Sequence, residues 1–306
     1  MAQTRGTFPA LQDNVAKQIT ALIGKEVAEL KRKYPRVFPK VSFDSKFKRF
    51  VTSAPFGDVP EKPEGTEYTT DLIQQANTKD VTPREWGLMF EYTETADEDD
   101  QYDELKKKSK YLAFSMGRVE DKTAADVFNL GFSTQTTADG VALFSTAHTL
   151  KRGGTAKNRP SSDADLSFTS LVQAFTDLAT DTKIESGQLA EPPESYLLLV
   201  PPHLEMLAHR LVKSTGIPQS AENDTNPLKD LRKITVMVWP DLTDTDAWFL
   251  VPMDKERNGL IYAERIPITL KPVVEDPRTG NMLARIRCRK TWDALDWRNS
   301  YGTSGA

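Results

Sequence analysis

The sequence has little of the material from which disulfides and metal sites are made. Its 306 residues include one cysteine, Cys288, and three histidines, which excludes an internal disulfide and a CxxC metal site. His203 and His209 are six positions apart, whereas the HExxH pattern places two zinc ligands four positions apart on one helical face. We therefore expect neither a metal nor a cofactor.

Long hydrophobic runs and an excess of positive charge are also missing. No apolar stretch approaches the roughly 18 residues of a membrane helix, and the start MAQTRGTFPA does not have the form of a signal peptide. The formal net charge is −4 at pH 7, which argues against a domain that binds nucleic acid through a broad basic face. The sequence predicts a protein that is made and assembled in the cytoplasm, without a membrane partner.

The stretch 139–148 contains the residue types of a serine hydrolase site but lacks the sequence motif of one. Ser145 and His148 lie close together in FSTAH, and Asp139 precedes them. The GxSxG turn that exposes a serine nucleophile is missing, and the glycine-bearing stretch 151–158 lacks the frame of a P-loop. We predict that the chain is not an enzyme. A soluble hydrolase using Ser145 and His148 is the alternative from another class, with turnover that Ser145→Ala removes.

Two long helices are the clearest features that the sequence does contain. Apolar residues recur at helical spacing from Asp13 to Lys33, which predicts an amphipathic helix that Pro35 ends. A run of acidic residues followed by lysines predicts the start of a second helix, over 97–131. Such a helix of about 30 residues would be about 45 Å long, far beyond the usual length in globular proteins.

Residues 52–93 differ from both helices. Prolines and glycines open this stretch, and threonines and aromatic residues follow, which predicts a two-stranded excursion with a loose tip. An excursion with so little core of its own needs an outside surface on which to lie.

The remainder alternates strands and helices. The patterns predict helices over 166–181 and 203–213, buried strands over 196–200, 234–238 and 248–251, and a hairpin of 265–274 with 282–290. We find no internal repeat. The order predicts a mixed α+β fold with at least two sheets.

Four stretches resemble the major head subunit of Mu-like phages, in the same order along the chain. They are DGVALFSTAHTLKRGGTAKN with DADLSFTSL (139–171), YLLLVPPHLEMLAHRLVKS (196–214), NPLKDL with PDLTDTDAWFLV (226–251) and RIRCRKTWDALDWRNSYGTSGA (285–306). Together they cover about half of the chain, and the first 95 residues contribute no motif to the resemblance.

The resemblance implies the Hong Kong 97 capsid fold. Its parts would be an N-terminal arm at 1–50, an extended β-hairpin loop at 51–93, a peripheral domain at 94–163 and 261–306 with a spine helix at 97–131, and an axial domain at 164–260.

The function implied by the resemblance is that of a major capsid protein of a tailed bacteriophage or prophage. Copies would self-assemble into pentamers and hexamers of an icosahedral head that encloses double-stranded DNA without reading its sequence. The implied location is the virion, and the implied partners are a scaffold or protease, a portal and decoration proteins. An encapsulin-like protein compartment of the same fold is the nearest alternative, and a tail or baseplate protein is a third.

Candidate subunit contacts come from the acidic and lysine-rich run and from tryptophans near arginines. Tryptophan and arginine dominate the energetics of protein interfaces. For the tryptophans near the C-terminal end, packing of a terminal strand within the chain is an equal alternative. The candidate residues are Arg84, Trp86, Asp99, Asp100, Lys106, Lys107, Trp292, Trp297 and Arg298.

Overall fold

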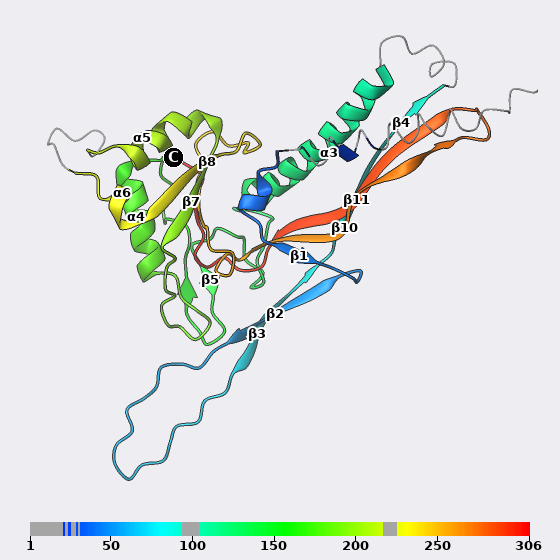
Figure 1. Ribbon diagram of the computed structural model, residues 1–306. Coiled ribbons are helices and arrows are strands. Elements are labelled where there is room, and N and C mark those ends of the chain that lie inside the picture. The colour runs from blue at the N-terminus through cyan, green and yellow to red at the C-terminus, as the bar shows by residue number, and fades with distance from the viewer. Residues whose placement is uncertain (1–20, 22–23, 26–28, 30, 94–103, 217–224) are drawn as a thin grey trace, which may run out of the picture.

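The structure is a computed structural model that describes residues 31–93, 104–216 and 225–306, together with Ala21, Gly24, Lys25 and Glu29. Two four-stranded and two two-stranded sheets lie in this part of the chain. Figure 1 shows a layered body, a long arm made of a helix on a sheet, and a narrow excursion that leaves both. The predicted α+β fold with at least two sheets is confirmed.

The arm is built on one long β-hairpin, which confirms the hairpin expected at 265–274 and 282–290. β10 (Leu260–Glu275) and β11 (Met282–Ala294) pair antiparallel. β4 (Arg84–Tyr92) pairs antiparallel with the far side of β11, and β1 (Lys40–Ser42) pairs parallel with β10. The sheet therefore has the order β1-β10-β11-β4, with β4 at one edge.

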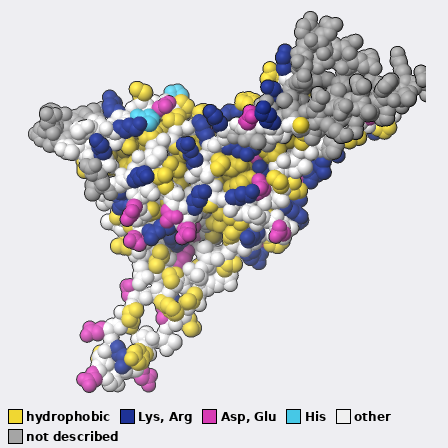
Figure 2. Space-filling view, in the orientation of Figure 1, with side chains coloured by type: hydrophobic (Ala, Val, Ile, Leu, Met, Phe, Trp, Pro, Cys, Tyr) yellow, Lys and Arg dark blue, Asp and Glu magenta, His cyan; other side chains and the backbone are white. Residues whose placement is uncertain are grey.

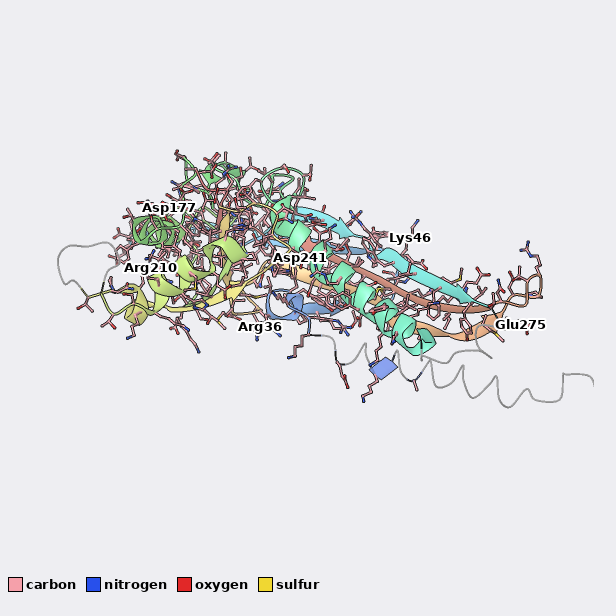
Figure 3. All side chains as sticks on the ribbon, turned by 90° about the horizontal axis from the view of Figure 1, so that it is seen from above. Arg36, Lys46, Asp177, Arg210, Asp241 and Glu275 are labelled. Atoms are coloured by element: carbon pink, nitrogen blue, oxygen red, sulfur yellow. The ribbon has the colours of Figure 1, made fainter. Side chains whose placement is uncertain are left out.

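Helix α3 (Glu104–Asn129) lies along this sheet (Figure 3). Leu112 and Met116 of the helix are buried against Ile286 and Cys288 of β11, so one stripe of the helix covers one face of the sheet. The long helix predicted over 97–131 is confirmed for 104–129, and residues 94–103 lie outside the described part.

Gly131 follows the end of α3, and its lack of a side chain allows the Phe144 ring to come close to the backbone there. A Cβ atom at this position would lie 2.9 Å from the Phe144 ring and 3.0 Å from the Phe128 carbonyl oxygen. Only glycine fits there without moving its neighbours. Phe144 can thereby pack beside Phe128 at the end of the helix, with ring centroids 6.5 Å apart.

The excursion, residues 48–81, is shorter than the sequence predicted. β2 (Lys48–Ala54) and β3 (Gln74–Val81) pair antiparallel, and residues 55–73, which we call the tip segment, contain no strand. The prediction extended the excursion to residue 93, whereas residues 84–92 belong to the arm sheet as β4. Trp86, Phe90 and Tyr92 alternate along β4 and pack under α3, and this apolar alternation draws the strand into the arm.

The body contains the second four-stranded sheet, in the order β12-β9-β7-β8. β7 (Ser195–Val200) is buried at every position after Ser195, with a parallel partner in β8 (Lys233–Val238) and an antiparallel one in β9 (Trp248–Pro252). All three strands confirm the sequence prediction. β12 (Tyr301–Thr303) closes the sheet against β9.

Helices cover this sheet. α4 (Phe168–Thr180) begins at Ser167, whose hydroxyl accepts from the Ser170 amide in a capping box. The 3-10 turn η3 (Pro202–Leu204) leads into α5 (Glu205–Lys213), and α6 (Leu228–Leu231) follows. α4 and α5 contribute Leu171, Leu178, Ala208 and Leu211 to the core with β7. The helices expected over 166–181 and 203–213 are confirmed.

The N-terminal segment is tied to the middle of α3. The Lys33 and Tyr34 amides, at the start of the 3-10 turn η2 (Tyr34–Arg36), both donate to Asp121 Oδ1. Most of the helix predicted for 13–33 lies outside the described residues. No helix of the described chain is long and apolar enough to cross a membrane.

Candidate assembly surfaces

His148 is held inside the chain and is not exposed for catalysis. It lies on β5 (His148–Thr149), which pairs with β6 (Thr155–Ala156), and it is fully buried. Its Nδ1 lies 2.7 Å from Asp139 Oδ2, and its ring stacks on Trp297 with centroids 4.2 Å apart. Burial opposes the charged form of Asp139, but hydrogen bonds from His148 and Thr137 outweigh it and lower the pKa of Asp139.

The geometry does not make Ser145 a nucleophile. His148 Nε2 lies 3.1 Å from Asn158 Oδ1, which also accepts from the Ser145 amide. Nε2 is therefore a donor and cannot take a proton from the Ser145 hydroxyl. That hydroxyl instead accepts from the Ala147 amide. Asp139 and His148 thus pair as the hydrolase alternative requires, but the serine is not joined to them.

The other motifs weighed for chemistry have structural partners. In the loop 151–158, the Lys151 amide donates to Glu185 and the Arg152 guanidinium binds Asp71, so both groups are engaged within the chain. No group of three or more metal-ligating side chains occurs among the described residues. The thiol of Cys288 is buried, and burial raises its pKa to about 11, so it is not a reactive thiolate.

The neck of the excursion is fixed to the body by charge. Arg152 donates to both carboxylate oxygens of Asp71 and to the Leu72 carbonyl, and the Gly57 amide also binds Asp71. The hydrogen bond from Arg152 is the main cause that lowers the pKa of Asp71 to about 2. On the other side of the neck, Gln188 donates to Asp58. These bonds set the direction in which the excursion leaves the body.

Apart from the residues bound at the neck, the tip segment is exposed, and its side chains are largely apolar or acidic. Its large apolar side chains project into solvent, with Val59 94% and Tyr68 84% exposed. The segment has five carboxylates and one lysine, a net charge of −4. Figure 2 shows these acidic side chains, in magenta, at the end of the excursion with apolar side chains among them. Exposed apolar surface on a segment without a core of its own marks a contact with another molecule.

The arm sheet offers a second exposed surface. Because Ile286 and Cys288 face α3, strand alternation directs the arginines that precede, separate and follow them to the opposite face. We call Arg285, Arg287 and Arg289 the arginine row. Within the described residues, the only ion pair made by the row joins Arg287 to Glu85 on β4, at 3.6 Å.

Three of the predicted contact residues are part of the subunit's own interior. Trp292 and Trp297 are buried in the main core. They pack within the chain, as the alternative to a subunit contact predicted. Arg298 binds Glu185 and Asp296 and donates to the Lys183 carbonyl. It therefore holds the base of the excursion rather than presenting a free charge.

Three other predicted contact residues, Arg84, Trp86 and Lys107, lie on the arm. Arg84 is exposed at the start of β4, and Trp86 is half-buried beneath α3. Lys107 is exposed on the first turn of α3. The side chains of Asp99, Asp100 and Lys106 lie outside the described part of the structure.

Sequence reasoning missed the arginine row and the neck of the excursion. The row was visible as the alternation of cationic and apolar residues in RIRCRK, since period two directs all three arginines to one face of a strand. No sequence signal pairs Arg152 with Asp71, because 81 positions separate them.

Solved structures of several shell proteins share this fold. The procapsid protein of bacteriophage JBD30 matches with a TM-score of 0.55 at 13% identity, over 97% of this chain and 76% of that one. The capsid protein of cyanophage P-SCSP1u matches with a TM-score of 0.61 at 9% identity, over 90% and 88%. A virus-like particle protein from Pyrococcus furiosus gives 0.53 at 11%, over 94% and 98%.

The fold therefore defines a protein of the Hong Kong 97 capsid class, as the sequence predicted. A family profile described as phage capsid protein matches residues 76–301, which is 226 of the 306 residues. The chain belongs to this phage capsid protein family. Comparison of the sequence with curated proteins gives no significant match.

Proposed function

We propose that this capsid protein is the major subunit of the head of a tailed phage or prophage. Its copies form pentamers and hexamers of an icosahedral shell around double-stranded DNA. The observation that carries this proposal is the family match over 76–301, on a chain whose fold matches shell proteins along nearly its whole length. The protein acts by association, with no chemical step.

We assign the parts of the chain to assembly as follows. The axial domain at 164–260 forms the centre of each pentamer or hexamer. The N-terminal arm at 1–50 and the extended loop, predicted at 51–93 but without residues 84–92 of β4, overlap adjacent subunits, and the peripheral domain at 94–163 and 261–306 carries them. Many modest contacts then act together, because each contact raises the effective concentration of the next.

The predicted contact residues fall into two groups under this proposal. Arg84, Trp86 and Lys107, which lie on the arm, contact neighbouring subunits, and we assign Asp99, Asp100 and Lys106 to the same role. We expect Asp99→Lys with Asp100→Lys to impair assembly while the subunit stays folded. Normal shells from this double variant would argue against that contact. Trp292, Trp297 and Arg298 act indirectly, by holding the core and the base of the excursion.

The finer assignment is to the Mu-like phages, which the four resembling stretches support. A scaffold or protease, a portal and decoration proteins are then the expected partners. The DNA is enclosed without sequence-specific contacts, in keeping with the net charge of −4. Assembly takes place in the bacterial cytoplasm, and the product is the virion.

A second candidate function is an encapsulin-like compartment that holds protein cargo. The similarity to the virus-like particle protein from Pyrococcus furiosus, over 98% of that chain, favours it. The contents of the shells distinguish the two, since a phage head protects DNA from nuclease and a compartment retains a protein.

The test is negative-stain electron microscopy with sedimentation velocity, on the purified chain alone and on the chain co-expressed with its scaffold. Closed shells, or rings and sheets of pentamers and hexamers, are the expected result. A stable monomer in the presence of the scaffold would contradict the proposal. Ser145→Ala is the matched check on the hydrolase alternative, and we expect it to assemble as the parent does.

A further inference from the structure

Helix α3 has an exposed line of side chains on the side away from the arm sheet. Lys107, Tyr111, Phe114 and Arg118, which we call the α3 seam, are all exposed and follow one another at intervals of four, three and four. At 3.6 residues per turn, this spacing places the four side chains along one face of the helix. Figure 3 shows the arm sheet along the other side of α3.

The middle of the α3 seam is apolar. Tyr111 is 67% exposed and Phe114 is 58% exposed. Aromatic side chains are enriched in the cores of protein interfaces, where their burial contributes most of the binding energy. Two exposed rings, one turn apart on a helix, therefore mark a contact with another molecule.

The charge around these rings is positive. Five exposed side chains between positions 107 and 122 are cationic, whereas the only carboxylates of this interval, Glu120 and Asp121, are buried. Arg118 pairs with Asp241 of the body, and the other four cations extend the positive charge along the helix. An acidic partner therefore complements this face. The five cations are Lys107, Lys108, Lys110, Arg118 and Lys122.

The spacing of the α3 seam indicates the shape of that partner. Intervals of four, three and four are those of the a and d positions in a coiled coil, where one helix packs along another. The part of α3 from Lys107 to Lys122 is about 22 Å long at 1.5 Å per residue, which is about two heptads. A second helix laid along it would cover both rings and bring its flanking side chains beside the lysines.

The described body helices of a second copy do not match this face. The only carboxylate of α4, Asp177, is buried. On α5, Glu205 is accompanied by two exposed cations, Arg210 and Lys213. Neither helix offers an exposed acidic face, so the matching helix comes from another protein.

We propose that the α3 seam binds an acidic amphipathic helix of a separate scaffold chain, with Tyr111 and Phe114 as the apolar centre of the contact. This inference rests on the proposed function, because it names the surface of the subunit that receives the scaffold. DNA would pair with the lysines but would leave both rings in water, so it matches the charge only.

Fluorescence anisotropy of labelled synthetic helices tests the contact on the full-length, unassembled subunit. The acidic probe is a peptide about three heptads long with leucine at a and d and glutamate at e and g, and the basic probe has lysine in place of glutamate. We expect the acidic probe to bind the parent at least about tenfold more tightly than the basic one. The seam variant, Tyr111→Ser with Phe114→Ser, should weaken the acidic probe at least about tenfold.

Charge reversal tests the specificity of the contact. Lys107→Glu with Lys122→Glu should weaken the acidic probe and strengthen the basic one, each about tenfold. The matched control is Met206→Ser with Lys213→Glu, which changes one exposed apolar and one exposed cationic side chain of α5. This control should bind both probes as the parent does. Circular dichroism verifies that each variant is folded.

Shell formation with the scaffold co-expressed is the second readout. The seam variant should give few closed shells, whereas the α5 control should give as many as the parent. Three outcomes would overturn the proposal: the acidic probe binds the parent no better than the basic one, the folded seam variant assembles normally, or duplex DNA binds through Lys107 and Lys122 while the acidic probe does not bind. If the parent forms no shells with its scaffold, the proposed function fails, whereas the binding of the probes still reports on the α3 seam itself.

Discussion

The ammonium group of Lys290 lies 2.5 Å from a carboxylate oxygen of Glu120, and the two side chains are only 3% and 1% exposed. The other oxygen of Glu120 lies 2.7 Å from Arg32, and Glu264 lies 3.3 Å from Lys290. The pair thus joins β11 to α3 beneath the N-terminal segment. Buried charges are stable only while they remain paired, so this network fixes how the long helix lies on its sheet.

Lys290→Ala should destabilise the isolated subunit strongly. Removing the lysine leaves Glu120 and Glu264 buried with less positive charge, and breaking such a pair costs about 3–5 kcal/mol. Urea denaturation followed by circular dichroism measures the loss in the free energy of unfolding. Arg49→Ala is the control, because Arg49 and Asp80 form an exposed pair worth at most about 1 kcal/mol. Equal losses in the two variants would contradict the role assigned to burial.

His148→Ala should loosen the link between β5 and the segment that contains Trp297. The substitution leaves Asp139 and Asn158 without a ring donor, at about 1–3 kcal/mol for each abandoned group. We expect a lower urea midpoint and a shift in tryptophan emission as Trp297 loses its stacked neighbour. His203→Ala changes an exposed histidine and should stay within about 0.5 kcal/mol of the parent. An unchanged midpoint for His148→Ala would refute this account.

Phe128→Ala should be among the most destabilising changes in α3. Its ring is fully buried and contacts Phe38, Phe144, Trp239 and Phe249. Truncating a buried phenylalanine costs about 3–5 kcal/mol. The matched control on the same helix is Phe114→Ala, whose side chain is 58% exposed. Thermal unfolding of isolated subunits should separate the two, and similar midpoints would mean that Phe128 is less important to the core than its burial indicates.

The neck of the excursion should respond to acid. The pKa of Asp71 falls from 3.8 to about 2 because Arg152 and the Gly57 amide bind the carboxylate. A lowered pKa means that the bond is fully present above about pH 4 and is lost as the pH falls towards 2. In a carbon-13 NMR titration of labelled aspartates, Arg152→Gln should move the Asp71 midpoint back towards 3.8. Lys151→Gln, beside it on the loop, should leave the midpoint in place, and the assignment fails if Arg152→Gln does so too.

Local patterns predicted the elements of the body and of the arm. The run at 196–200, the proline-opened helix after it and the long α3 all follow from periodicity and from residues that begin or end helices. The boundary between the excursion and the arm sheet, which falls just before β4, could not be predicted from local patterns. The pairing of β4 with β11 depends on contacts between positions about 200 residues apart. Pro83 separates β3 from β4, but it does not show that the two strands join different sheets.

Sequence alone could not show whether a tryptophan beside an arginine lies in the core or on the surface, for a physical reason. Tryptophan beside arginine is typical of interfaces, but it is equally typical of a core that stacks a ring and binds a guanidinium. Trp297 and Arg298 do the second, since Arg298 lies over the Trp297 ring at 4.8 Å and binds Glu185. Burial separates the two cases, and it depends on the whole fold rather than on neighbours in sequence.

The pairing of β12 with β9 affects the timing of folding during synthesis. Tyr301–Thr303 follow every other strand in chain order, yet they close the body sheet against Trp248–Leu250. A ribosome must therefore have made both the excursion and the arm hairpin before the body is complete. The body sheet therefore gains its edge strand only after the residues of the excursion and of the arm have been made, so it is completed late relative to both.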